Sequence, residues 1–167
     1  MSSDAPTIDI EQLNDSTELV QPVKKAKARH SSWLVTINTN FAVRTGDEPE
    51  LPEMKQRLTN AYNALFEGDN ILDLIEYRDE STAGSEFIDD ISVTGTIEIG
   101  PVKRLLHLHA ILSIKHRSKI RMRYGKITRI VHEKSPGAYC NLKPFNNSYA
   151  YMLDYISKNK EMLKRDM

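Results

Sequence analysis

The strongest structural signal in this chain is ISVTGTIEIGPVKRLLHLHAILSI, residues 91–114. Residues 91–99 alternate apolar and polar side chains, which is typical of a half-buried β-strand. Residues 105–114 are almost continuously apolar, which indicates a central strand of a sheet. Gly100 and Pro101 provide a short turn between the two runs. The segment therefore predicts two adjacent antiparallel strands.

Two further elements are predicted before this segment. The β-branched and aromatic run WLVTIN, which starts at Trp33, predicts a first strand that ends at Asn38 and Asn40. In residues 54–66, apolar side chains recur at helical spacing, which predicts a helix. The run ILDLIEY, residues 71–77, predicts a second strand, and the polar residues 79–90 then predict a loop.

The region after residue 114 is less clear from its pattern. Residues 116–134 fit a helix by one periodicity and a strand by another, and Gly125 weakens the helix. AYCNLKPF, residues 138–145, predicts the last strand, and residues 147–163 predict a final helix. This order of elements predicts an α+β sandwich, a mostly antiparallel central sheet with helices packed on it.

Length and composition narrow the functional classes. The 167 residues suit one domain, residues 30–167, after a polar tail, residues 1–29, that we expect to be disordered and that is basic at its end. No P-loop pattern occurs, so ATP-driven unwinding would come from a separate or host helicase, or from a further part of a longer chain. The single cysteine, Cys140, excludes a disulfide framework. Without a long apolar run, we expect no membrane insertion.

The net charge of zero hides a division along the chain. Residues 1–100 hold 8 Lys+Arg and 19 Asp+Glu, a balance of 8 − 19 = −11, whereas residues 101–167 hold 15 and 4, a balance of 15 − 4 = +11. A basic surface attracts a polyanion, usually nucleic acid. Alternatively, the two halves pack together and their charges compensate. The stretch PVKKAKAR, residues 22–29, resembles a short nuclear-import signal or a DNA-contacting arm, although a solvated linker would have the same composition. An import signal predicts the host nucleus, and without one we expect the cytoplasm.

The histidine pair in the HLH triplet is the first candidate site. In a strand, His107 and His109 point to one side and Leu108 to the other. A lone histidine in such a strand is usually a hydrogen-bonded core residue, but two on one face suggest ligands for a divalent metal. Mg²⁺ or Mn²⁺ would suit this pair with carboxylate help, and zinc stays open. Glu98 is the nearest carboxylate, or else an exposed surface residue; Glu76 is the reserve.

The tyrosines near the end of the chain are the second candidate site. If residues 147–163 form a helix, Tyr151 and Tyr155 lie one turn apart on one face, and Lys158 follows three residues later. A tyrosine needs a nearby cation to act as a nucleophile, because its ordinary pKa is near 10. Lys158 could stabilise the phenolate. Otherwise both tyrosines are ordinary packing residues of an amphipathic helix.

These residues match a family pattern. HLHAILSI and YMLDYISK, residues 107–114 and 151–158, resemble the two signature motifs of the HUH endonucleases, the rolling-circle replication initiators and related transposases. WLVTINTN, residues 33–40, is similar to their first motif, and Glu98 lies where many of them place a third metal ligand. The resemblance covers roughly residues 33–160 in the family's order, and it implies an HUH/Rep-like fold.

The resemblance also implies a function. His107, His109 and Glu98 would bind the metal, and Tyr155 would attack the scissile phosphate, leaving a 5′-phosphotyrosine and a free 3′-hydroxyl. Lys158 would assist, and Tyr151 would be a second nucleophile, as in two-tyrosine members. We therefore expect a sequence-specific single-strand DNA endonuclease and strand transferase that initiates replication or transposition. The alternative is a nucleic-acid-binding module on the same scaffold that does not cleave.

The expected substrate is single-stranded or hairpin DNA at an origin or element end. The residues predicted to neutralise its phosphates are Lys103, Arg104, Lys115, Arg117, Lys119, Arg121 and Arg123. Trp33, Tyr124 and Phe145 are candidates for stacking on bases, although each is also a natural core residue.

Overall fold

The computed structural model describes residues 27–45, 48–144 and 161–164. The strands are β1 (Arg29–Ala42), β2 (Ile75–Tyr77), β3 (Ile88–Ile99), β4 (Leu105–His116), β5 (Ile120–Met122), β6 (Tyr139–Pro144) and β7 (Glu161–Lys164). The α-helices are α1 (Leu51–Phe66) and α2 (Tyr124–Lys134), and short 3₁₀ helices span Gly68–Leu74, Glu80–Thr82 and Ser85–Phe87.

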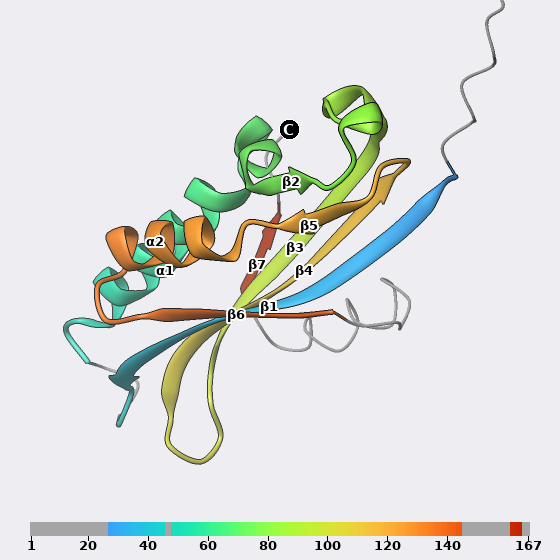
Figure 1. Cartoon of the computed structure of the whole chain (residues 1–167). Coiled ribbons are helices and arrows are strands. Elements are labelled where there is room, and N and C mark those ends of the chain that lie inside the picture. Colours follow the sequence, from blue (N-terminus) through green and yellow to red (C-terminus); the bar gives the residue numbers. More distant parts are fainter. Residues whose placement is uncertain (1–26, 46–47, 145–160, 165–167) are drawn as a thin grey trace, which may run out of the picture.

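Five of these strands form one antiparallel sheet in the order β6-β1-β4-β3-β7, and β2 pairs with β5 in a separate ribbon (Figure 1). The predicted α+β class with a mostly antiparallel sheet is confirmed. So are the central position of the histidine strand, β4, and its antiparallel pairing with β3. The turn between them is closed by the backbone N–H of Gly100, which donates to the carbonyl of Leu105 at 2.9 Å.

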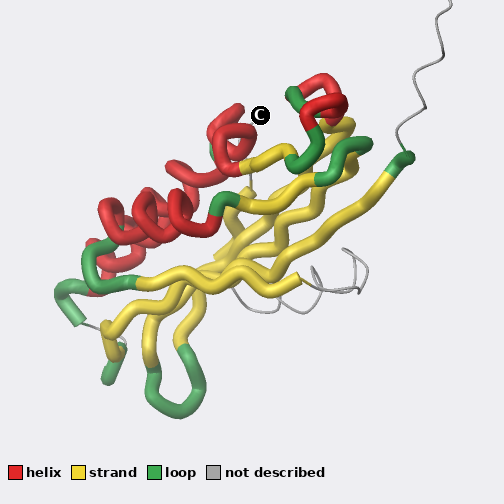
Figure 2. Tube along the Cα trace, viewed as in Figure 1, coloured by secondary structure: helices red, strands yellow, loops and turns green. Residues whose placement is uncertain are grey.

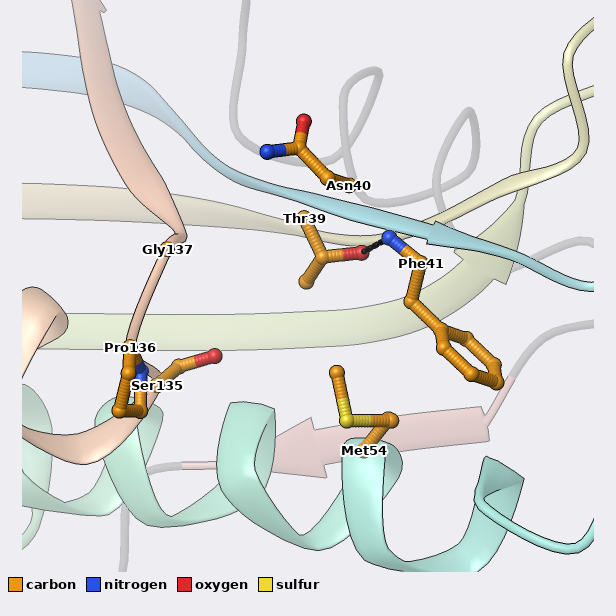
Figure 3. A pocket seen from close by; sticks show the side chains of 7 residues that line it. All are labelled: Thr39, Asn40, Phe41, Met54, Ser135, Pro136 and Gly137. Carbon is orange, nitrogen blue, oxygen red and sulfur yellow. Dashed lines mark hydrogen bonds between the residues drawn. The ribbon is translucent and has the colours of Figure 1, made fainter.

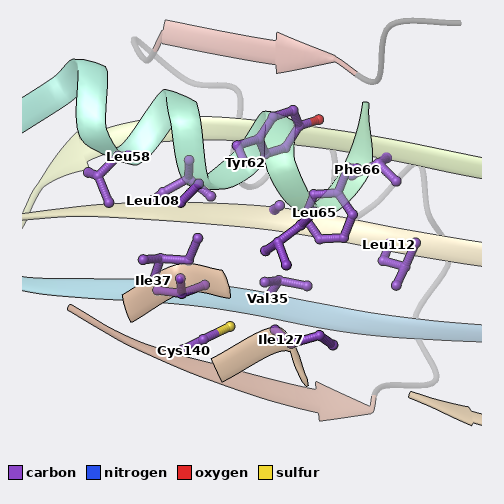
Figure 4. Packing of buried hydrophobic residues seen from close by; sticks show 14 of the residues in the cluster. Val35, Ile37, Leu58, Tyr62, Leu65, Phe66, Leu108, Leu112, Ile127 and Cys140 are labelled. Carbon is purple, nitrogen blue, oxygen red and sulfur yellow. The ribbon is translucent and has the colours of Figure 1, made fainter. Parts of the chain in front are cut away.

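Both α-helices lie on the same face of the sheet (Figure 2). The helix predicted for residues 54–66 is confirmed as α1, and its apolar spacing buries Leu58, Ala61 and Leu65. Ile127 and Val131 of α2 join the same core, into which β1 and β4 direct alternate side chains (Figure 4). Among the described residues, no helix is long and apolar enough to cross a membrane.

The alternation of side chains along β4 shows which residues lie on each face of the sheet. Leu106, Leu108 and Ala110 are completely buried and belong to the core beneath the helices. Successive side chains of a strand point to opposite faces, so His107 and His109 lie on the face away from the helices. A shift of one residue in the pairing would bury both histidines in the apolar core, and the apolar pattern therefore fixes the register.

Several predicted boundaries were wrong. Only Ile75–Tyr77 of the strand predicted at residues 71–77 is a strand, because Ile71 and Leu74 are buried three residues apart in a 3₁₀ helix. The predicted loop at residues 79–90 contains two 3₁₀ turns and the start of β3. The first strand begins at Arg29 rather than Trp33 and continues beyond Asn38, since β4 and β6 pair with it from both sides.

The ambiguous region and the end of the chain also differ from the expectation. Residues 116–134 contain both alternatives in succession, the short strand β5 and then α2, and Gly125 lies within α2. The strand predicted at residues 138–145 is confirmed as β6, but it is not the last strand. β7 occupies residues 161–164, where the sequence predicted the end of a helix, because pairing with the edge of β3 competes with helical propensity. The remainder of that predicted helix lies outside the described residues.

Candidate metal centre

Glu98, His107 and His109 come from the two adjacent strands β3 and β4. Glu98 is the direct cross-strand partner of His107, and His109 follows on the same face two residues later. One possible ligand atom from each of the three side chains lies within 4.8 Å of the others. The structure therefore brings together all three residues that the sequence suggested as metal ligands.

The three side chains already contact one another. Nδ1 of His109 lies 2.9 Å from Oε2 of Glu98, and Nε2 of His107 lies 3.4 Å from Oε1 of the same carboxylate. The two imidazole rings meet edge to face, with their centroids 4.7 Å apart. Their side chains are 13% and 20% exposed and that of Glu98 is 17% exposed, so the group is accessible to a small ion or a phosphate oxygen.

The backbone sets the tautomer of His107. Its Nδ1 lies 3.1 Å from the carbonyl oxygen of Leu105, which can only accept, so Nδ1 carries the hydrogen. In the neutral ring the lone pair is then on Nε2, which faces Glu98. A ligand histidine is commonly fixed in this way by a carbonyl that binds its other nitrogen. The carboxylate of Glu98 does the same for His109, since it accepts from Nδ1.

Thr96 adds a polar group beside these side chains. It is the cross-strand partner of His109, lies on the same face and is completely buried. Among the described residues its hydroxyl is one of two buried side-chain groups that lack a hydrogen-bond partner. A buried hydroxyl without a partner is costly. Together with two imidazoles and a carboxylate, it makes a donor set that fits a hydrated divalent ion.

The other predicted ligand lies away from these three side chains. Glu76, the reserve ligand, lies on the separate β2–β5 ribbon, where its carboxylate accepts from Arg121 at 2.9 Å and 3.0 Å. This ion pair lowers the pKa of Glu76 below its ordinary value, chiefly through the hydrogen bond. The candidate nucleophiles and their cation lie outside the described residues: Tyr151, Tyr155 and Lys158.

The basic residues predicted to bind phosphate divide between two ends of β4. Lys103 and Arg104 lie at the turn next to His107. Lys115 is eight positions along the strand from His107, about 26 Å away at the usual rise. At that far end Arg117 pairs with Asp89 at 3.0 Å. The far group consists of Lys115, Arg117, Lys119, Arg121 and Arg123.

The structure describes two of the three aromatic residues that the sequence suggested for stacking on bases. Trp33 is partly buried and packs against the core. Tyr124 is 51% exposed, and its hydroxyl donates to the carbonyl of Cys140 at 2.7 Å. Phe145 lies outside the described residues. Sequence reasoning missed Tyr139, which is 58% exposed. Strand pairing alone aligns it across the sheet with the candidate metal group, which consists of Glu98, His107 and His109.

A pocket on the helix side is a separate feature. It has a volume of about 330 Å³ and lies between the end of β1, α1 and residues 135–137 (Figure 3). The hydroxyl of Thr39 accepts from the backbone N–H of Phe41 at 3.2 Å and donates to the carbonyl of Leu106, so its polar group is satisfied. The pocket shares no lining residue with the metal group.

Comparisons of the chain with protein-family models, curated proteins and solved structures find no match. The functional argument therefore starts from the geometry of Glu98, His107 and His109.

Proposed function

We propose that this protein is a metal-dependent, sequence-specific single-strand DNA endonuclease and strand transferase that initiates rolling-circle replication or transposition. The observation that carries the proposal is the gathering of Glu98, His107 and His109 on one face of a central strand pair. The basic character of residues 101–167 and the resemblance to the HUH motifs give further support.

In this proposal His107, His109 and Glu98 hold Mg²⁺ or Mn²⁺. Such an ion, when bound, supplies Lewis-acid stabilisation of charge on the phosphoryl oxygens. The protein's own contribution is orientation, because the Leu105 carbonyl fixes the ring of His107 and Glu98 fixes that of His109. Rigid strands on both sides of β4 hold these side chains in place.

Tyr155 is the proposed nucleophile. Its phenolic oxygen gives up its proton and forms a bond to phosphorus while the bond to the 3′-oxygen breaks, and the departing 3′-oxygen takes up a proton to become a free hydroxyl. The product is a 5′-phosphotyrosine diester, so no water is consumed and the reverse reaction can join strands. Lys158 stabilises the phenolate, and Tyr151 serves as a second nucleophile in a strand exchange.

One observation favours the alternative function, a nucleic-acid-binding module without cleavage. Glu98 already accepts a hydrogen bond from His109 at 2.9 Å, which gives each of these two groups one partner without an ion. In that case the histidines would stabilise the β3–β4 pair, and the basic half would bind nucleic acid electrostatically.

The deciding experiment uses labelled single-stranded oligonucleotides that carry stem-loops, incubated with Mn²⁺ or EDTA and separated under denaturing conditions. We expect a covalent protein–DNA adduct that needs the metal and is lost in Tyr155→Phe and His107→Ala. A matched control is His132→Ala, because His132 is exposed in the last turn of α2. Survival in Tyr155→Phe with loss in Tyr151→Phe would reassign the nucleophile. Cleavage that needs neither metal nor tyrosine would refute the proposal.

A further inference from the structure

The edge strand β6 presents three exposed polar side chains at alternate positions: Tyr139, Asn141 and Lys143. The residues between them, Cys140 and Leu142, face the helical core. The three exposed side chains therefore point to the other face of the sheet, the one that carries the metal group. We call these three residues the β6 strip.

Strand register aligns the β6 strip with the metal group. Tyr139 pairs with Asn38 of β1, which pairs with His107 of β4. Asn141 pairs with Thr36, which in turn pairs with His109. Two strand spacings separate β6 from β4, so the strip runs about 10 Å from the histidines.

The strip combines three side chains that can each contact a different part of a nucleotide. Tyr139 is 58% exposed and is one of three large apolar or aromatic side chains that are exposed among the described residues. The other two, Val102 and Tyr124, lie at a turn and at the start of α2. An aromatic ring, an amide and an ammonium group follow at intervals of two residues, about 7 Å each. These groups can stack on a base, hydrogen-bond a base edge and neutralise a phosphate, respectively.

The strip is also held rigidly. β6 pairs with β1 along its whole length, from Tyr139 to Pro144. From the helix side, the hydroxyl of Tyr124 donates to the carbonyl of Cys140, the residue next to Tyr139. A pre-formed platform of this kind loses little conformational entropy when a ligand binds.

We propose that Tyr139, Asn141 and Lys143 bind a single strand of nucleic acid and direct it toward Glu98, His107 and His109. The substrate class is single-stranded because stacking on an exposed ring requires unpaired bases, which a duplex keeps within its own stack. This inference rests on the proposed function only for the direction of the strand, since the binding itself needs neither metal nor cleavage.

The test measures the anisotropy of fluorescent oligonucleotides in EDTA, with the full-length protein. The arms are single-stranded DNA, single-stranded RNA of the same sequence and duplex DNA. We expect Tyr139→Ala to weaken single-strand binding roughly 5- to 150-fold, the range measured for loss of one stacked base. Tyr139→Phe should restore it, because stacking does not need the hydroxyl. Preference for RNA over DNA would identify the nucleic acid and keep the inference.

The charge of Lys143 is tested through salt dependence. In Lys143→Gln, the slope of log affinity against log salt should fall by about 0.7, the value for one phosphate contact on a single strand. The matched control is Lys134→Gln, because Lys134 is an exposed lysine on α2 in the helical layer. It should leave affinity and slope unchanged.

Two outcomes separate the strip from the proposed function. If adduct formation depends on metal and tyrosine, but Tyr139→Ala and Lys143→Gln bind and react like the wild type, the strip is refuted and the nuclease stands. If no adduct forms but single-strand binding depends on Tyr139, the nuclease fails and the strip stands. Tyr139→Ala is compared with the wild type only if it keeps the wild-type melting temperature. If it does not, the salt slope of Lys143→Gln decides.

Discussion

Nε2 of His107 faces Oε1 of Glu98 at 3.4 Å, and both atoms carry lone pairs when the imidazole is neutral. The tautomer follows from the carbonyl of Leu105, which takes the hydrogen on the opposite nitrogen. Two acceptors that face each other are stabilised by a metal ion between them. The arrangement of His107 and Glu98 therefore predicts that this site binds a metal ion.

Mn²⁺ should raise the melting temperature of the wild-type protein. An ion that binds only the folded state stabilises it by about 2.7 kcal/mol at a concentration 100 times its dissociation constant. Glu98→Gln, His107→Ala and His109→Ala should each reduce this shift strongly, because each removes one ligand of the group. Differential scanning fluorimetry with a Mn²⁺ titration measures the effect, and His132→Ala serves as the control. An unchanged shift in the triple variant would place the ion elsewhere.

Thr96→Val should stabilise the metal-free protein and weaken its metal response. Valine has nearly the shape of threonine, and it removes a hydroxyl that is completely buried and has no partner among the described residues. Removal of this hydroxyl should raise the free energy of unfolding by about 1–3 kcal/mol. Urea unfolding in EDTA measures the first effect, and the Mn²⁺-induced shift in melting temperature measures the second. Destabilisation in EDTA would show that the hydroxyl is satisfied without metal.

The central part of the fold could be predicted because its signals are local. The alternation in β3, the apolar run of β4 and the turn at Gly100 specify a strand pair, and that pair positions Glu98 beside His107. The short apolar run at residues 71–77 was misassigned because Ile71 and Leu74 suit a strand and a 3₁₀ helix equally well.

Tyr139 and Thr96 could not be recognised from the sequence for a different reason. Each becomes notable only through pairing with a strand far away in the chain: Tyr139 with β1 and Thr96 with His109 of β4. Local alternation gives the face of a residue within its own strand, but it does not give the neighbours of that strand. The charge pattern has the same limit, since the seven basic residues predicted to bind phosphate divide between the two ends of β4.

Acidification from about pH 7 to about pH 5 should destabilise the protein through His116. This residue is 3% exposed, and burial lowers its pKa below the ordinary 6.5, while the carbonyl of Ser118 opposes the shift. Arg29 and His30 lower the pKa further, and Asp89 raises it. As the pH falls through about 6.5, the unfolded chain therefore binds a proton at His116 and the folded protein does not. The free energy of unfolding is highest above that pH and decreases below it.

Thermal melts across this pH range check the effect of His116. The loss should not exceed about 1.4 kcal/mol per pH unit for one proton, and His116→Gln should have a flatter profile than the wild type. His132→Gln, an exposed histidine on α2, should keep the wild-type slope. Equal slopes in all three proteins would mean that His116 takes up its proton in the folded state.

Gly95→Ala should destabilise the protein because it brings a methyl group against the ring of Tyr62, the side chain of α1 that covers β3 at this point. A Cβ at Gly95 would lie 2.8 Å from Cε1 of Tyr62 and 3.3 Å from Cβ of Ala110. Tyr62 is 1% exposed and meets Phe66 edge to face, with ring centroids 5.3 Å apart, so it has little room to move. Overpacking of this kind costs about 1–3 kcal/mol, which urea unfolding resolves.

Gly125→Ala is the matched control for that substitution. A Cβ at Gly125 meets nothing within 4 Å, and its position in α2 favours alanine by up to about 1 kcal/mol. The same substitution should therefore lower the free energy of unfolding at Gly95 and raise it at Gly125. Tyr62→Leu should recover part of the loss in Gly95→Ala, because it removes the atom that the new methyl group meets. If the double variant shows strict additivity, the contact between β3 and α1 does not explain the glycine.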